Sequence, residues 1–230
     1  MAAMSADIDI KVFLILAGVA LVIGLIIYSF VAAAERRKAL LAWCQSNGLE
    51  FDPERSEDPG AGDSQVSVMQ EGHDRYGENW CTGQWQGRAL CCFDYHYTTG
   101  SGKSQSSHSL SMMTIASPSP LKSLIIRPEG FLDKVGEFFG AQEIHFESAE
   151  FNRRYHVWCE DRKWAYDALP PRALELLLSD PRRLHVQFDR QTVVFWDGEV
   201  WSPENIGRAA RTASGLMDVM PRFAVQEAME

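Results

Sequence analysis

The chain has 230 residues, of which 46% are hydrophobic, and its formal net charge is −9 at pH 7. This length suits one large domain or two small ones behind an apolar segment. Because a surface of this sign repels phosphates, the composition argues against nucleic acid as a partner. The five cysteines are an odd number, which favours a reducing compartment over a disulfide framework.

Residues 12–34 form an apolar segment without a charged side chain. A helix over these residues would be roughly 34 Å long, enough to cross a hydrocarbon core of about 30 Å. We therefore predict a single transmembrane helix in the lipid bilayer, after a short extracytoplasmic N-terminus at residues 1–11. A cleaved signal peptide is the alternative, because Ala32, Ala33 and Ala34 resemble a small-residue cleavage site, but the apolar run is longer than such peptides have.

The charges that flank this segment indicate its orientation. Arg36, Arg37 and Lys38 follow it directly, whereas Lys11 alone precedes it as a basic residue. Lys and Arg are retained on the cytoplasmic side of a membrane. The expected location is therefore the inner (cytoplasmic) membrane, crossed once, with the N-terminus outside and the soluble domain in the cytoplasm.

Small residues recur at helical spacing within the predicted span, at Ala17, Ala20 and Gly24. Such a stripe can let a second helix approach closely, although small residues are common in membrane helices without a partner. The span contains no histidine or charged residue, which argues against ion transport, proton relay and ligation of haem or chlorophyll by this helix.

Residues 35–48 are predicted to continue the helix as a neck that ends near Gly48, since glycine accepts the left-handed conformation at a helix end. Residues 49–117 have the alternating pattern of a β-rich subdomain. Within it, Gln86 and Gly87 predict a two-residue hairpin turn. Such a turn would pair residue 85 with 88, 83 with 90, and 81 with 92.

That register places Cys81 opposite Cys92 on one side of the hairpin. Facing thiols allow a redox or metal role, yet two thiolates do not complete the usual four-ligand zinc shell. Cysteines that pack as small apolar side chains are the alternative. Residues 100–104 contain the letters GKS, but residue 97 is tyrosine where a P-loop needs glycine, and no helix is predicted to follow, so we expect a hairpin loop. No cofactor and no metal are expected.

Residues 118–230 are predicted to form an α+β subdomain that ends in a long helix, from Ser202 to about residue 227. The elements expected before it are a helix at 130–139, a strand at 151–160, helices at 164–169 and 171–179, and a hairpin of 184–188 with 192–196. The expected fold class is α+β: one N-terminal transmembrane helix followed by a soluble domain with an antiparallel or mixed sheet and packed helices.

The passage FNRRYHVWCEDRKWAYDALPPRALELLL at 151–178, with the strands LHVQF and TVVFW after it, resembles an uncharacterised family of bacterial membrane-anchored proteins that carry a domain of unknown function. The resemblance covers roughly residues 121–201. It implies a strand, a short helix, a proline and a leucine-rich helix in that order, and it provides no catalytic residue to transfer.

Side chains able to carry chemistry are scattered. His145, His156 and His185 each alternate with apolar neighbours, so we expect them on a shared, solvent-facing sheet surface. Asp94 and His96 share a strand face, but the sequence places no serine or cysteine beside them, so it predicts no hydrolytic triad. Most of the seven tryptophans are expected in the core, with some left for a protein-binding patch.

These patterns favour a non-catalytic, membrane-tethered interaction or accessory subunit of a larger membrane protein complex, with another membrane protein as its partner. A respiratory or photosynthetic complex is one concrete form of this hypothesis. The alternative is a membrane-anchored enzyme, or a small-ligand or redox sensor, whose site is assembled from residues distant in sequence.

Overall fold

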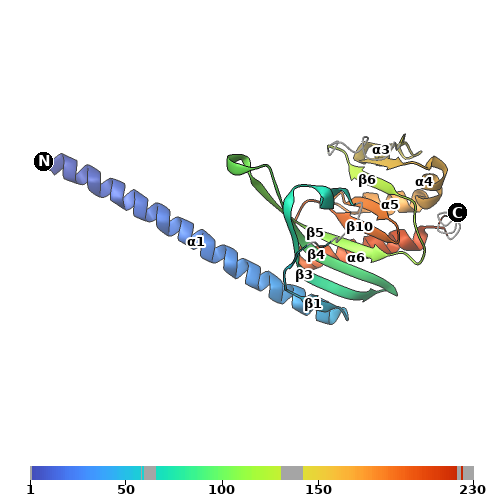
Figure 1. Ribbon diagram of the computed structural model, residues 1–230, viewed down its shortest axis with the longest axis horizontal. Helices are drawn as coiled ribbons and strands as arrows, with labels where there is room; N and C mark the ends of the chain where they lie inside the picture. The colour runs from blue at the N-terminus through green and yellow to red at the C-terminus, as the bar shows by residue number, and fades with distance from the viewer. Residues whose placement is uncertain (1, 58, 60–65, 131–141, 222–223, 225–230) are drawn as a thin grey trace. The chain divides into compact units, whose positions relative to one another are not determined.

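The computed structural model describes residues 2–57, 59, 66–130, 142–221 and 224 of the chain. The chain divides into two compact units, residues 1–39 and residues 40–230 (Figure 1). The first unit is helical, and the second contains the sheet and the remaining helices.

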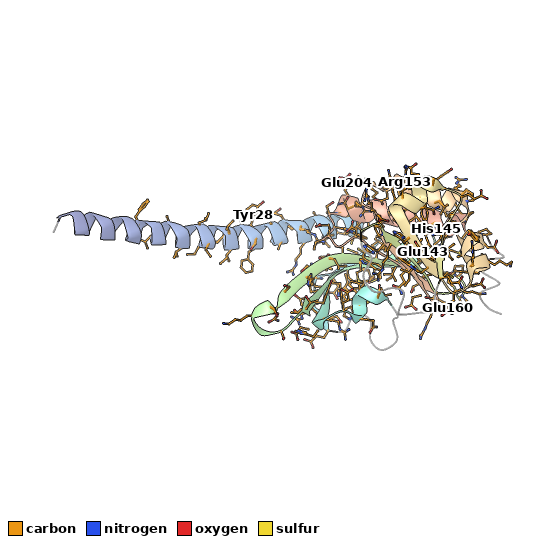
Figure 2. All side chains as sticks on the ribbon, turned by 90° about the horizontal axis from the view of Figure 1, so that it is seen from above. Tyr28, Glu143, His145, Arg153, Glu160 and Glu204 are labelled. Atoms are coloured by element: carbon orange, nitrogen blue, oxygen red, sulfur yellow. The ribbon has the colours of Figure 1, made fainter. Side chains whose placement is uncertain are left out.

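The first unit is most of a single long helix, α1 (Ala2–Ser46). Its large apolar side chains described between Phe13 and Val31 are between 49% and 73% exposed, and Tyr28 projects freely from the helix (Figure 2). Within the described residues, this is the one helix long and apolar enough to cross a membrane. Apolar surface in contact with water costs about 25 cal/mol per Å². A bilayer would remove that cost, so the helix fits membrane anchoring.

The second unit begins with the last turns of α1. Leu40 and Cys44 are fully buried there, and Trp43 stacks on Trp85 with ring centroids 6.0 Å apart. Gly48 follows the helix with φ +68, a conformation in which glycine has no side-chain clash, and it lets the chain turn into the first strand.

The described residues of the second unit form one ten-stranded sheet in which every strand pair is antiparallel. Its order is β1-β3-β4-β5-β10-β9-β6-β8-β7, with β2 also paired to β3. The strands are β1 (Glu50–Asp52), β2 (Ser56–Glu57), β3 (His73–Trp85), β4 (Arg88–Thr99), β5 (Ser106–Ala116), β6 (Leu124–Pro128), β7 (Gln142–Ile144), β8 (Tyr155–Cys159), β9 (His185–Asp189) and β10 (Thr192–Trp196). The pairing of β5 with β10 joins strands from residues 49–117 to strands from residues 118–230 in one sheet.

Capping residues begin three of the helices that pack on this sheet. The side chains of Ser148, Asp161 and Ser202 each accept a hydrogen bond from a backbone N–H in the first turn. The helices described here are α3 (Ala149–Arg154), α4 (Arg162–Ala168), α5 (Pro171–Ser179) and α6 (Pro203–Val219), with 3-10 turns η1 (Ser67–Gln70) and η2 (Gly102–Ser104). The α+β fold class predicted from the sequence is confirmed.

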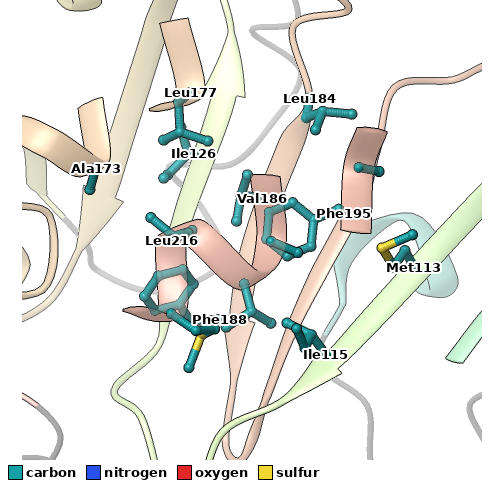
Figure 3. Packing of buried hydrophobic residues seen from close by; sticks show 14 of the residues in the cluster. Met113, Ile115, Ile126, Ala173, Leu177, Leu184, Val186, Phe188, Phe195 and Leu216 are labelled. Atoms are coloured by element: carbon teal, nitrogen blue, oxygen red, sulfur yellow. The ribbon is translucent and has the colours of Figure 1, made fainter. Parts of the chain in front are cut away.

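The main core lies between the sheet and the helices, chiefly α5 and α6 (Figure 3). Phe188 and Phe195 of the central strands are fully buried with Leu216 of α6. Helix α6 contacts β5 and β10, and its buried alanines, such as Ala210 and Ala213, take up little space between helix and sheet. A second cluster is built on aromatic residues of β4. It also contains Val68 of η1 and Val66, the residue before η1.

Two of the predicted elements differ from the observed ones. The strand predicted at 151–160 is wrong in its first part, because α3 occupies Ala149–Arg154 and β8 begins only at Tyr155. The last helix, expected to reach about residue 227, ends at Val219, before Pro221, which has no N–H to continue it. Residues 222–223 and 225–230 lie outside the described residues, as does the helix predicted at 130–139 apart from its first residue.

Candidate functional site

The second unit contains a groove of about 720 Å³ between α5, the end of α4 and the loop that follows β7. We call it the groove throughout; it is lined by His145, Phe146, Glu147, Ser148, Tyr166, Leu169, Pro171, Leu174, Glu175 and Leu178. Its size lies within the roughly 300–1,000 Å³ typical of sites that bind small molecules or anchoring side chains.

The floor of the groove is apolar. Phe146 is 7% exposed, Leu169 1% and Leu174 5%, so each is packed into the core on one side and reaches the groove on the other. Leu174 and Leu178 are one helical turn apart on α5 and therefore lie on the same face of that helix. Pro171 occupies the first turn of α5, where its missing N–H costs nothing.

One wall of the groove, residues 145–148, is fixed to α3 by two side chains. The N–H of Phe146 donates to Oδ1 of Asn152 at 3.0 Å, and Nδ2 of Asn152 donates to the carbonyl of Phe146 at 2.6 Å. Ser148 caps the same helix, because its hydroxyl oxygen accepts from the N–H of Phe151 at 3.2 Å. These hydrogen bonds hold the wall in one conformation.

A second part of the lining is built around Tyr166 of α4, which adjoins the wall at 145–148. Its hydroxyl donates to the backbone carbonyl of His145 at 2.9 Å and accepts from the guanidinium of Arg162 at 3.1 Å. Its ring meets Phe146 edge-on, with centroids 5.2 Å apart, and the side chain is still 36% exposed. The tyrosine thus ties α4 to the loop and offers an aromatic surface to a bound group.

Two acidic side chains stand at the rim of the groove, and one basic side chain lies beside its lining, because the guanidinium carbon of Arg162 is 5.6 Å from the centroid of the Tyr166 ring. Glu147 stands on the loop and Glu175 on α5, and both are exposed. His145, labelled in Figure 2, is also exposed and lines the groove. An apolar floor under two carboxylates suits a group that combines an apolar body with positive charge.

The hairpin register predicted from Gln86 and Gly87 is confirmed. The observed partners are Trp85 with Arg88, Gly83 with Leu90, and Cys81 with Cys92. The structure adds Cys44 from the end of α1, whose thiol hydrogen-bonds with that of Cys81. This third thiol was not predicted, since nothing in the sequence places the end of α1 over the hairpin.

The three thiols are at most 1% exposed and are not joined by a disulfide. The hydrogen bond with Cys44 and burial raise the pKa of the Cys81 thiol far above its ordinary value. A protonated, enclosed thiol such as that of Cys81 is a poor nucleophile and a poor metal ligand, whereas the same hydrogen bond lowers the pKa of the Cys44 thiol. In the part of the chain that the structure describes, no group of three His, Cys, Asp or Glu side chains could hold a metal ion. A redox role for the pair stays a prediction.

The three histidines occupy different surroundings. His185 is 6% exposed and stacks on Trp196 with centroids 5.1 Å apart, so the expected solvent-facing position is wrong for this residue. Burial and the charge of Arg127 lower the pKa of His185 to about 3. His156 of β8 pairs in register with Arg127 of β6, and His145 lies at the groove.

His156 lies between two carboxylates, those of Glu143 and Glu129. The hydrogen bonds to Glu143 and Glu129 raise the pKa of the His156 imidazole, although partial burial opposes this. As an imidazolium, its two ring N–H groups can donate to both glutamates. It therefore links β8 to β7 and to the residue after β6.

Asp94 belongs to a closed hydrogen-bond network rather than to a reactive site. It is 4% exposed and accepts from the hydroxyl of Ser111 at 2.7 Å and from the side-chain amide of Asn79 at 2.9 Å. The hydroxyl oxygen of Ser111 accepts in turn from the N–H of Trp201 at 2.8 Å. The network joins three strands to the segment before α6.

A serine does lie beside His96, which the sequence could not place. Oγ of Ser109 is 2.8 Å from Nδ1 of His96, and Glu78 is 3.5 Å from its Nε2. Burial lowers the pKa of His96. These three residues lie on neighbouring strands and do not line the groove, whereas a hydrolytic site also needs a substrate cleft and oxyanion donors.

The predicted helix-packing residues, Ala17, Ala20 and Gly24, lie on α1 and are exposed. A Cβ atom at Gly24 would meet nothing within 4 Å, so the first unit does not itself require glycine there. Binding of a second helix to this stripe stays a prediction. So does the role of the predicted topology determinants, which follow on the same helix: Arg36, Arg37 and Lys38.

The groove was missed because its parts come from three separate segments that only the fold brings together. One local signal was available: Ser148 before an acidic residue at position 150 is a typical helix start and would have located α3. The contribution of Asn152 depends on the loop that it clamps and carries no sequence signature.

Comparison with known proteins gives one informative similarity. No family model matches the sequence, and no curated protein matches it. Among solved structures, the crystal structure of the mycobacterial trehalose monomycolate transport factor A, TtfA, is similar at 13% sequence identity, with a TM-score of 0.60. The similarity covers 80% of this chain and 93% of that one. At this identity it establishes a shared fold.

Proposed function

We propose that this protein is a single-pass, membrane-tethered accessory protein of a membrane transport system, and that it acts by binding a partner rather than by catalysis. The observation that carries the proposal is a candidate membrane helix joined to a domain with the fold of a protein described as a transport factor. The transport assignment replaces a respiratory or photosynthetic complex as the concrete form of the hypothesis.

The orientation proposed is N-terminus outside and domain in the cytoplasm, at the inner membrane. The basic residues Arg36, Arg37 and Lys38 directly after the apolar segment support it, because such residues are retained on the cytoplasmic side. The free cysteines are compatible with a reducing compartment. The helix tethers the domain and, through Ala17, Ala20 and Gly24, offers a stripe for a partner's helix.

The chemistry of the described side chains supports a binding role. Asp94 is enclosed in a structural network, burial keeps His185 neutral at physiological pH, and Cys81 is held protonated. The groove, in contrast, is open and preformed, and its lining is apolar with an acidic rim. Such a site provides affinity and selectivity without bond chemistry. We also propose, on the sequence passage at 151–178 alone, a relation to bacterial membrane-anchored proteins that carry a domain of unknown function.

Gentle detergent extraction of the full chain from its native membrane, followed by native mass spectrometry, tests the proposal. The expected result is a stable complex with an integral membrane protein of a transport system. Respiratory or photosynthetic subunits in its place would refute the transport assignment. A lone monomer would refute the accessory role altogether, and a tightly bound small molecule without protein would favour the ligand-sensor alternative.

A further inference from the structure

We propose that the groove receives a segment of a partner membrane protein that is both apolar and basic and lies next to one of that protein's membrane spans. This inference rests on the proposed function and names the chemistry of the partner.

The floor of the groove requires apolar side chains in the segment that binds. Phe146, Leu169 and Leu174 give it an apolar base, and the exposed ring of Tyr166 extends that base along one wall. A volume of about 720 Å³ holds a few large side chains. Apolar or aromatic side chains from the partner would bury this surface, as anchor residues do at protein interfaces.

The rim of the groove favours positive charge in the segment that binds. Glu147 stands on the loop after β7 and Glu175 on α5, and the whole chain carries a net charge of −9. A Lys or Arg that flanks the apolar anchors would be attracted to either carboxylate and would be favoured over an acidic residue. The specificity expected is therefore for positive charge beside apolar side chains.

The proposed orientation supplies a partner segment with this composition. Membrane proteins concentrate Lys and Arg within about 15–20 residues of the ends of their spans on the cytoplasmic side. These segments are also rich in apolar residues, where the chain enters the bilayer. A domain tethered on the same side meets them at high effective concentration.

The groove needs little rearrangement before it binds. Asn152 clamps Phe146 through two hydrogen bonds, and Tyr166 is tied to the carbonyl of His145. A site that is already ordered loses less conformational entropy when it binds. An anionic lipid headgroup is the less favoured occupant, because the two rim glutamates would repel it and Arg162 alone would attract it.

Photo-cross-linking identifies the occupant directly. The photoreactive amino acid p-benzoylphenylalanine would replace Pro171, which is exposed and lines the groove, in the full-length protein in native membranes. The matched control places it at Val200, which is 42% exposed and does not line the groove. We expect a cross-link from position 171, and not from position 200, to a membrane protein within about 20 residues of one of its spans, in a segment of net positive charge.

Charge reversal tests the role of the rim. Glu147→Lys with Glu175→Lys should reduce the cross-link from position 171 by roughly tenfold, since two attractions become repulsions. Glu54→Lys with Glu160→Lys is the control, because these two glutamates are exposed, lie outside the groove lining and change the net charge equally. The inference is overturned by a lipid adduct, by a cross-link to an acidic or soluble segment, or by equal yields in the two double variants.

Failure of this inference is distinguishable from failure of the proposed function. If a transport protein co-purifies with the wild type and equally with Glu147→Lys/Glu175→Lys, the partner binds elsewhere, and the accessory role stands while the groove assignment falls. If no membrane protein co-purifies with the wild type, both fall. Thermal unfolding of each variant, followed by tryptophan fluorescence, establishes that the domain has kept its fold.

Discussion

Two regions of the domain, the hydrogen-bond network of Asp94 and the groove, use their polar groups in opposite ways. Around Asp94, each polar atom described is directed at another within the fold, and the cluster is closed to solvent. At the groove, hydrogen bonds lie behind the walls, while an apolar floor and two exposed carboxylates remain available. Asp94, which looks reactive in the sequence, is therefore enclosed within the fold, whereas the open surface of the groove is formed by residues of ordinary type.

The largest expected effect comes from breaking the closed network. Asp94→Ala leaves the buried groups of Asn79 and Ser111 without their acceptor, so we expect the free energy of unfolding to fall by about 3 kcal/mol. Chemical unfolding of the full-length protein in detergent, followed by tryptophan fluorescence, measures this. The exposed control Glu160→Ala should change it by less than about 0.5 kcal/mol. Similar values for both variants would show that the network carries little stability.

A smaller effect is expected where the walls of the groove meet the core. Asn152→Ala removes both hydrogen bonds to the backbone of Phe146, so the free energy of unfolding should fall by about 2 kcal/mol. Because the loop at 145–148 loses its clamp, cross-linking from position 171 should also weaken while the protein is still folded. Unchanged cross-linking in a destabilised variant would mean that preorganisation of this wall does not matter for binding.

The sequence alone predicts features that depend on residues close together in the chain, and it does not predict those that depend on distant residues. The hairpin register was predictable because a two-residue turn at Gln86 and Gly87 fixes every pair on both strands. Helix α5 was predictable because Pro171 and the spacing of its leucines are local signals. The position of β6 between β9 and β8 was not, since it depends on contacts between segments far apart in the chain.

The chemistry of single residues was harder to predict than the elements that carry them. His185 alternates with apolar neighbours like a residue at a sheet surface, yet it is buried against Trp196. Ser109 reaches His96 only because β4 and β5 pair in one register. The groove required α4, α5 and the loop after β7 to be placed together, and no local pattern encodes that arrangement.

The pH dependence of stability provides a third, smaller test, at the edge of the sheet. The hydrogen bonds to Glu143 and Glu129 raise the pKa of His156 in the folded protein, so its contribution is fully present below the unfolded value near 6.5 and is lost as pH rises through the folded value. These glutamates are partly exposed, so the loss should be about 1 kcal/mol or less. Thermal unfolding of wild type and His156→Gln from pH 6 to 9 measures it; parallel profiles would contradict the assignment.

The smallest effect is expected at the serine beside His96. Ser109→Ala should leave partner binding unchanged and alter the free energy of unfolding by less than about 0.5 kcal/mol, because this serine is exposed. Reaction of the wild type with a fluorophosphonate probe measures its reactivity, and no labelling at Ser109 is expected. Labelling that disappears in Ser109→Ala would instead support the enzyme alternative.

The most direct measurement compares three versions of the full-length chain, extracted gently from native membranes, by quantitative mass spectrometry of what co-purifies. Wild type and Glu54→Lys/Glu160→Lys should both retain the same transport protein, and Glu147→Lys/Glu175→Lys should lose most of it, by roughly tenfold. Equal retention by all three, or no membrane partner with the wild type, would contradict an accessory protein that binds through this groove.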